Sequence, residues 1–339
     1  MNQQQWRSRA LSRAALAASG AALLLGVTAC GSGGSGGSGS TGGETGGEAS
    51  ESASSFPEND ITFIVQAAAG GGSDLSSRAL ASEMEGLLDT SIVVENRPGA
   101  SGTVAFEYVR DQEPDGYTIG FSPVEIAMVQ HLGFDITPAE FDFLGQIMFS
   151  PGVIAVPSSS EIETLDDLIE ASKERPLTVA NSGAGSIWEA ATLGLADETG
   201  ADLQPVPFDG GAPAVAAALG AQVDAVVAGA GETVGAHNDG SLRVLALFND
   251  EEHPLLEGVP TAESEGYDLM FGGWGGVYAP SGLPDDVRET LAAAVEEAAG
   301  SDGFADAITP SGALPTYKSP DEFVEFIDSE SERFGTLLG

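Results

Sequence analysis

A glycine-rich stretch, "QAAAGGGSD" at residues 66–74, is the first place where the residue types suggest chemistry. Three glycines let the backbone turn sharply, and Ser73 or Asp74 can cap the helix that the following residues predict. The unpaired N–H groups of such a helix start, aided by the helix dipole, suit an anion such as a carboxylate. The alternative interpretation is a tight strand-to-helix turn without a ligand. The stretch matches neither a P-loop nor a G-x-G-x-x-G pattern, so it predicts no cofactor.

Residues for covalent or metal-assisted catalysis are scarce. The sequence has three histidines, His131, His237 and His253, and none lies beside a G-x-S-x-G pattern or in metal-ligand spacing. Its acidic residues are too abundant to single out a pair for acid–base chemistry. No metal site and no catalytic residue are predicted, and an exported α/β hydrolase is the weakest of the functional hypotheses.

The charge of the chain is strongly negative, with a formal net value of −40 from 12 basic and 52 acidic residues. Nucleic acid is therefore excluded as a partner, because phosphate contacts need a basic face. Repulsion between exposed charges decays over about 8 Å at physiological salt. Hydrogen-bond donors within a cleft can therefore hold an anion despite the overall charge.

The N-terminal region has the pattern of an export signal followed by a lipid anchor. Three arginines precede the apolar stretch "AALAASGAALLLGV", and small residues lead to Cys30, the only cysteine. Residues 1–29 are predicted to be a lipoprotein signal peptide, with Cys30 as the lipidated residue; an ordinary signal with a free thiol is the alternative. Residues 30–55 are rich in Gly, Ser and Glu and predict a flexible linker with a reach of roughly 25 to 30 Å. Removal of the three arginines would leave a formal charge of −43.

The remaining residues alternate short β-branched runs with alanine-rich helical segments, which is typical of an α/β fold with parallel strands. A first series of strands and helices covers residues 61–123, and the long apolar run of residues 141–160 predicts a strand that crosses between lobes. A second series covers residues 164–249. A final strand at residues 274–284 and helices at 285–301 and 320–338 complete the prediction.

Two lobes with a mainly parallel sheet in each are therefore expected. The first lobe comprises residues 56–150 and a return segment, residues 247–339, whereas the second lobe comprises residues 151–246. Two crossings between the lobes form a hinge. The loops at the carboxyl ends of the strands face the cleft, where α/β proteins place their ligands.

Several motifs in sequence order resemble those of one receptor family. They include "FPENDITFIVQAAAGGGSDLSSRALA", "VVENRPGASG", "PDGYTIGFSP", "VANSGAGS", "VPFDGGAPAVAAALGAQVDAVVAG" and "WGGVYAPSGLP". From Phe56 to Gly339 the chain is similar to the periplasmic solute receptors of tripartite tricarboxylate transporters, the TctC or Bug family. The resemblance implies a two-lobed type II periplasmic-binding-protein fold, or Venus flytrap. It also implies delivery of a small carboxylate to a permease with one large and one small subunit. A hinged receptor is most simply a monomer, and lipidation of Cys30 would place it on the outer face of the cytoplasmic membrane.

The same resemblance implies a set of ligand-binding residues in loops of both lobes. In the first lobe they are Ala68, Gly70, Gly71, Gly72, Ser73, Asp74 and Ser122; in the second they are Ser182, Gly183, Gly185, Ser186, Gly210, Gly211 and Ala212. Asp74 is expected to order its loop by pairing with Arg78 at i,i+4 rather than to contact an anion. Each serine is equally consistent with a plain helix cap.

Trp188, Arg97 and the pair Gln66 and Ala67 are considered separately. Trp188 is expected either to wall the pocket or to pack in the core, and Arg97 to tie down a loop or pair with an acid. Many relatives carry a proline and an aromatic residue where this chain has Gln66 and Ala67, which makes the identity of the solute uncertain. A receptor that signals to a sensor instead of feeding a permease is the remaining alternative.

Overall fold

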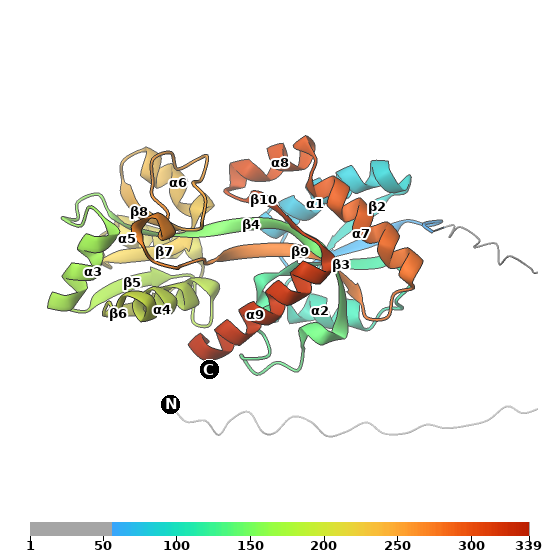
Figure 1. Cartoon of the computed structure of the whole chain (residues 1–339), viewed down its shortest axis with the longest axis horizontal. Coiled ribbons are helices and arrows are strands. Elements are labelled where there is room, and N and C mark those ends of the chain that lie inside the picture. Colours follow the sequence, from blue (N-terminus) through green and yellow to red (C-terminus); the bar gives the residue numbers. More distant parts are fainter. Residues whose placement is uncertain (1–55, 339) are drawn as a thin grey trace, which may run out of the picture. The chain divides into compact units, whose positions relative to one another are not determined.

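The computed structural model describes residues 56–338 (Figure 1). The predicted signal peptide (1–29), the linker (30–55) and Cys30 lie outside the described residues. Among the described residues, no helix is both long and apolar enough to cross a membrane.

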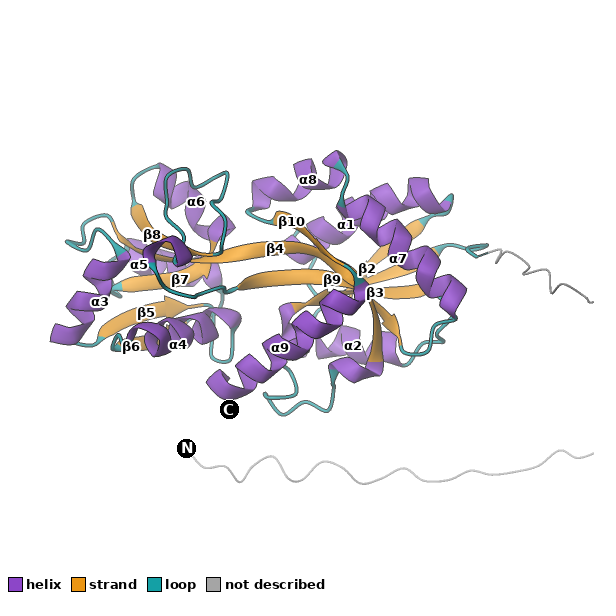
Figure 2. Cartoon of the chain, viewed as in Figure 1, coloured by secondary structure: helices purple, strands orange, loops and turns teal. Residues whose placement is uncertain are grey.

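A first group of strands comes from both ends of the described chain. Strands β2, β1 and β3 run parallel, and β3 continues into antiparallel β9, β4 and β10. The strand bounds are β1 Ile61–Val65, β2 Ile92–Asn96, β3 Thr118–Pro123, β4 Phe141–Pro157, β9 Gly272–Pro280 and β10 Leu314–Lys318. The helix bounds are α1 Gly72–Leu88, α2 Thr103–Arg110, α7 Asp285–Ala299, α8 Asp302–Ile308 and α9 Pro320–Leu338 (Figure 2).

A second group of strands surrounds the C-terminal part of β4. Strands β6, β5 and β7 run parallel, whereas β4 is antiparallel to both β7 and β8. The strand bounds are β5 Leu177–Asn181, β6 Leu203–Pro207, β7 Ala225–Gly229 and β8 Leu242–Phe248. The helix bounds are α3 Leu165–Glu174, α4 Ile187–Thr199, α5 Gly211–Leu219 and α6 Ala230–Asn238. Three strands in each group are thus parallel as expected, and the others make both groups mixed.

Strand β4 connects the two groups because its pairing changes within one continuous strand. Pro151 is still paired with Gly272 of β9, whereas Gly152 is paired with Gly229 of β7 and Phe248 of β8. The strand is 17 residues long and buried along almost its whole length. Its near-continuous apolar sequence matches this burial on both faces.

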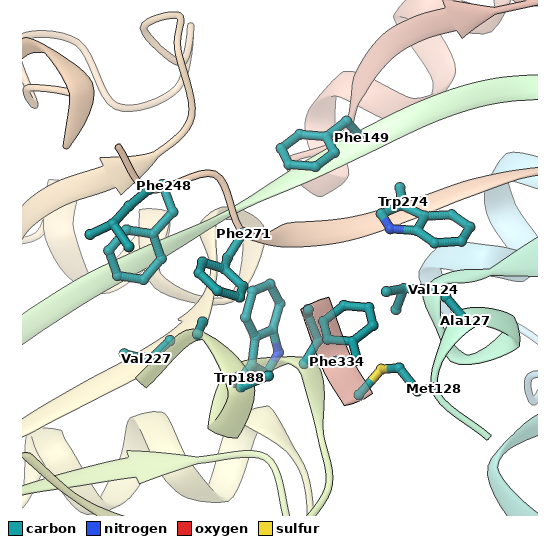
Figure 3. Packing of buried hydrophobic residues seen from close by; sticks show 14 of the residues in the cluster. Val124, Ala127, Met128, Phe149, Trp188, Val227, Phe248, Phe271, Trp274 and Phe334 are labelled. Atoms are coloured by element: carbon teal, nitrogen blue, oxygen red, sulfur yellow. The ribbon is translucent and has the colours of Figure 1, made fainter. Parts of the chain in front are cut away.

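The period-two alternation of the strands distributes their side chains between separate parts of the core. Phe63 faces a cluster with α1, α7 and α8, and Ile64 faces a cluster with α2 and α9. The second cluster continues under α3 and α4, so one core extends through both strand groups. Figure 3 shows Trp188, Phe271 and Phe334 among its side chains.

The structure confirms the predicted strands and helices to within about four residues at their ends. Besides several short 3₁₀ helices, it adds two α-helices and one strand that the sequence did not predict. They are α6, α8 and β10. Helix α8 is short but capped, since Ser301 Oγ accepts a hydrogen bond from the Phe304 N–H at 3.0 Å. Strand β10 pairs with β4, more than 150 residues away in the sequence, so no local pattern marks it.

Candidate functional site

A cavity of about 280 Å³ is lined by residues from both strand groups and from the segments that connect them. The lining residues come from α1, β3, the turn after β3, β4, α4, β9 and the segment before β10. They are Gly72, Ser73, Ser76, Phe121, Pro123, Val124, Glu125, Met148, Ser150, Ile187, Trp188, Gly273, Trp274, Ser311 and Ala313. The volume is at the lower end for ligand pockets, so the cavity suits a small solute.

The start of α1 supplies uncapped hydrogen-bond donors to this cavity. Gly71, the residue before the helix, has extended φ and ψ of −77° and 168°, and no side chain caps the helix. Leu75 N–H bonds to the Gly71 carbonyl at 2.9 Å, but the N–H groups of Gly72, Ser73 and Asp74 have no acceptor among residues 56–338. Gly72 and Ser73 line the cavity. The partial positive charge of the helix start therefore lies at the cavity wall.

Asp74 orders the loop before α1 from within the helix, and its predicted pair with Arg78 is confirmed. Its Oδ2 accepts the Gly70 N–H at 2.8 Å, and its Oδ1 accepts Asn96 Nδ2 at 2.8 Å. Burial alone would raise the pKa of Asp74, but the hydrogen bonds from Arg78, Gly70 and Asn96 outweigh it and hold the pKa below its ordinary value.

The hydrogen bonds within this loop determine which of its main-chain N–H groups remain available as donors. The Gly70 N–H is held by Asp74, and the Gly71 N–H bonds to the Ala68 carbonyl at 3.3 Å. Gly70 and Gly71 are therefore not free donors, and neither they nor Ala68 line the cavity. Of the predicted loop residues, only Gly72 and Ser73 do so. Contact of Ala68, Gly70, Gly71 and Asp74 with a solute stays a prediction.

The start of α4 repeats the arrangement on the opposite side of the cavity. Ser186 Oγ caps the Glu189 N–H at 3.2 Å, and the N–H groups of Ile187 and Trp188 have no acceptor in the described part of the chain. Ile187 and Trp188 both line the cavity. Trp188 is 9% exposed and belongs to the core cluster, so it fulfils both of the roles that the sequence left open.

The predicted donors in the loop before α4 are used internally. The Gly183 N–H bonds to Asn181 Oδ1 at 3.0 Å, the Gly185 N–H to Glu189 Oε2 at 2.6 Å, and the Ser186 N–H to the Gly183 carbonyl at 3.2 Å. The lining of the cavity does not include Ser182, Gly183, Gly185 or Ser186. The donors on this side are the next two residues along the chain, inside the helix.

The third predicted loop and Ser122 also lie away from the cavity lining. The Gly210 N–H bonds to the carbonyls of Ser182 at 3.1 Å and Phe208 at 2.9 Å, and Gly211 and Ala212 are absent from the lining. Ser122 is fully buried between the lining residues Phe121 and Pro123.

Arg97 does not line the cavity. Its guanidinium pairs with Glu95 at 2.7 Å and stacks on Tyr108, 3.5 Å from the ring centroid. The structural role predicted for it is confirmed.

Glu125 is a lining residue that the sequence reading missed. It follows the end of β3, and within residues 56–338 the hydrogen-bond donor to its carboxylate is its own main-chain N–H. Burial raises the pKa of Glu125 above its ordinary value. An acid directly after a strand, in "SPVE", was the available signal, because ligands bind at carboxyl ends of strands.

Two other cavities, of about 290 and 310 Å³, share Phe149, Met270 and Phe326 in their walls. None of their lining residues opens a helix of the described chain, so neither cavity receives a helix start. The cavity between α1 and α4 is for this reason the candidate functional site. Among the described residues, no group of three or more His, Cys, Asp or Glu could hold a metal ion.

The fold and the two helix starts define the class of protein: an α/β solute-binding receptor. The family described as the tripartite tricarboxylate transporter family receptor, TctC, matches residues 76–339, and the chain belongs to this family. Protein BugT of Bordetella pertussis is 28% identical over 300 residues, which cover 85% of this chain and 90% of BugT. The family is one of binding receptors, so the expectation that this chain is no enzyme is supported.

Solved structures show the same fold. A TctC solute-binding protein from Polaromonas, without ligand, has a TM-score of 0.77 at 27% identity, covering 84% of this chain and 99% of that one. MatC from Rhodopseudomonas palustris, solved with bound malate, has a TM-score of 0.67 at 27% identity over 84% and 100% of the two chains. A second R. palustris protein, solved with adipate, has a TM-score of 0.70 at 26% identity over 83% and 97%.

Proposed function

We propose that this chain is an extracytoplasmic receptor that captures a small carboxylated solute in the cavity between α1 and α4 and delivers it to a tripartite tricarboxylate-type permease. The observation that carries the proposal is the pair of helix starts at one cavity, each with free N–H groups on its first two residues: Gly72 and Ser73 in α1, Ile187 and Trp188 in α4. Charge-assisted bonds from such donors to a carboxylate are each worth roughly 1.5 to 3 kcal/mol.

The related structures support the ligand class. MatC is solved with malate and the second R. palustris protein with adipate, and both ligands are small dicarboxylates. In this chain the lining contains no Lys, Arg or His, so its donors include main-chain N–H groups and the hydroxyls of Ser73 and Ser76. The hydroxyls of Ser150 and Ser311 already donate to the carbonyls of Gly312 and Ile308. The other predicted site residues, Ala68, Gly70, Gly71, Asp74, Ser122, Ser182, Gly183, Gly185, Ser186, Gly210, Gly211 and Ala212, are proposed to shape the surrounding loops.

The domain and anchoring proposals belong to the same function. We propose that residues 56–150 and 247–339 form one lobe and residues 151–246 the other, supported by the change of pairing between Pro151 and Gly152. Hinged closure would then bring the starts of α1 and α4 around the solute. Lipidation of Cys30 would hold this receptor, as a monomer, on the outer face of the cytoplasmic membrane.

A ligand screen tests the proposal. The mature protein is titrated by calorimetry, after a thermal-shift screen, with monocarboxylates, dicarboxylates, amino acids, sugars and inorganic phosphate at low and high salt. Carboxylates are expected to bind. High salt should lower their affinity only slightly, because the donors are local and the repulsion from surface acids is screened. Binding of sugars or phosphate without binding of any carboxylate would contradict the ligand class.

Delivery to a permease needs a separate measurement. Membrane vesicles that contain the large and small permease subunits are expected to take up the solute only when the loaded receptor is added. Uptake at the same rate without the receptor would contradict the transport role while leaving the binding role intact.

A further inference from the structure

Glu125 does not fit a cavity built only for anions. It is the one charged side chain among the lining residues, and no cation lines the cavity with it. A carboxylate here repels an anionic solute at close range, where salt screens little. The cavity therefore has two regions of opposite character: the helix starts of α1 and α4, which attract negative charge, and Glu125, which attracts positive charge.

No hydrogen bond from another described residue to the Glu125 carboxylate holds the turn in which it lies. The turn after β3 is held by the main chain, since the carbonyl of Glu125 accepts the N–H groups of Met128 and Val129, both at 2.9 Å. Any residue at position 125 would provide this carbonyl. Within residues 56–338 no ion pair involves the Glu125 side chain. A charged acid without a partner beside apolar side chains is costly, so it either takes up a proton or gains a partner from outside the chain.

Aromatic side chains line the same cavity. Phe121, Trp188 and Trp274 contribute to the lining, and Trp274 is fixed by a hydrogen bond from its Nε1 to Glu330 Oε2 at 3.2 Å. Indole faces attract cations as well as apolar groups. The cavity thus combines donors for a carboxylate, one acid and aromatic walls.

We infer that the solute carries an ammonium group that pairs with Glu125, in addition to the carboxylate at the helix starts. The ligand class would be small amino-carboxylates rather than plain dicarboxylates. This inference rests on the proposed function and specifies its ligand. A zwitterion with one carboxylate has no net charge, so the surplus of 52 acidic over 12 basic residues in the chain does not repel it.

The test uses pairs of ligands that differ only in the amino group. Succinate is compared with aspartate, glutarate with glutamate, and propionate with alanine, each titrated by calorimetry into the wild-type protein. N-acetylaspartate, which keeps the carboxylates but removes the ammonium charge, is titrated as well. The wild type is expected to bind at least one amino-carboxylate about tenfold or more tightly than its plain partner and than its acetylated form.

The matched variants are Glu125→Gln and Glu107→Gln. Both remove one negative charge, but Glu107 lies on the exposed face of α2 and does not line the cavity. Glu125→Gln is expected to lose about tenfold or more in affinity for the amino-carboxylate and to bind the plain partner as well as or better than the wild type does. Glu107→Gln is expected to bind both as the wild type does.

The outcomes separate this inference from the proposed function. If plain dicarboxylates bind more tightly than amino-carboxylates and Glu125→Gln weakens them, Glu125 is a neutral acid that donates to a second carboxylate, and the inference is overturned. Equal affinities in the wild type and in Glu125→Gln overturn it too. If no carboxylate of either kind binds, the proposed function itself fails. The comparison with N-acetylaspartate uses only the wild type, so it remains decisive if the variant does not fold.

Discussion

The carboxylate of Asp74 accepts a hydrogen bond from the main-chain N–H of Gly70 at 2.8 Å, so a side chain inside α1 closes the loop that precedes the helix. This bond removes one donor from the loop and fixes the path by which the chain enters the cavity wall at Gly72 and Ser73. The site therefore depends on a buried acid that does not line it.

Asp74→Ala tests this dependence. The variant frees the Gly70 N–H and leaves Arg78 and Asn96 without their shared acceptor, so we expect a loss of about 1 to 3 kcal/mol in unfolding free energy. Affinity for the carboxylate is expected to fall roughly tenfold because the start of α1 is less ordered. Urea unfolding and calorimetry measure the two effects. Arg78→Met, which removes only the more exposed partner, should have the smaller effect on both, and a full-affinity Asp74→Ala protein would show that the loop needs no such closure.

Gly71→Asp should separate stability from binding. Gly71 has an extended backbone that any residue can adopt, and an added Cβ would meet only the Ala68 carbonyl, at 3.4 Å. An aspartate there can cap the free N–H groups of Ser73 and Asp74, which stabilises the helix by about a few tenths of a kcal/mol relative to glycine but occupies the donors. We expect a higher melting temperature and at least about tenfold weaker carboxylate binding. Gly71→Ala has no capping atom, and it should bind normally; weak binding by the alanine variant would point to shape rather than donors.

Glu125→Gln should be more stable than the wild type at neutral pH without ligand. A carboxyl group whose pKa is raised in the folded state holds its proton more tightly there than in the unfolded chain. Wild-type stability therefore falls as pH rises above the ordinary value of 4.5. Glutamine has no proton to lose, so the variant should gain about 1 to 3 kcal/mol at pH 7 and nothing below pH ~4. Melting curves over this range measure the difference, with Glu107→Gln as the control. A destabilised variant at pH 7 would reveal a structural role for the carboxylate.

Asp224, in the second strand group, gives the stability of the protein the opposite pH dependence. The hydrogen bond from Arg175, followed by those from the Thr178 N–H and hydroxyl, lowers the pKa of Asp224 to about 2. The resulting stability is present above the unfolded pKa of about 3.9 and is lost as pH falls through about 2. Asp224→Asn is expected to cost about 2 kcal/mol at pH 7 and much less at pH ~2.5. Ligand affinity should not change, since Asp224 does not line the cavity. Urea midpoints that are equal at pH 7 would refute the prediction.

The order of strands and helices was largely predictable because its signals are local. The apolar run of β4 and the alternation of short strands with alanine-rich helices are features of neighbouring residues. Of the predicted site residues, only Gly72 and Ser73 are among those that line the cavity. The sequence could not show which main-chain N–H groups are already hydrogen-bonded within the protein. Asp74 and Glu189 can each reach several loop N–H groups, and the folded geometry selects those of Gly70 and Gly185.

The remaining cavity wall was unpredictable for a different reason. Trp274 and Ser311 reach the site through pairings between segments more than 100 residues apart, β9 and β10 with β4. No residue spacing in the sequence indicates that these distant segments pair. Glu125 was visible as an acid after a strand, but with 52 acidic residues in the chain it did not stand out.

Gly152→Ala tests whether the crossing point of β4 controls the cavity. An added Cβ would lie 2.8 Å from Trp188 Cζ3, 3.0 Å from the Phe271 carbonyl and 3.1 Å from Phe248 Cδ2. The carbonyl cannot move without breaking its bond to the Gly152 N–H at 2.8 Å, so the Trp188 ring must shift. We expect a loss of about 1 to 3 kcal/mol in stability and weaker solute binding, because Trp188 lines the cavity.

The control for this variant is Gly86→Ala in α1. The added methyl group there meets nothing within 4 Å, and alanine is expected to stabilise the helix by about 0.5 to 1 kcal/mol without altering affinity. Unfolding and titration of both variants, together with the tryptophan fluorescence of Gly152→Ala, measure the displacement of Trp188. Unchanged affinity and fluorescence in a destabilised Gly152→Ala protein would show that the crossing strand supports the fold but does not set the shape of the cavity.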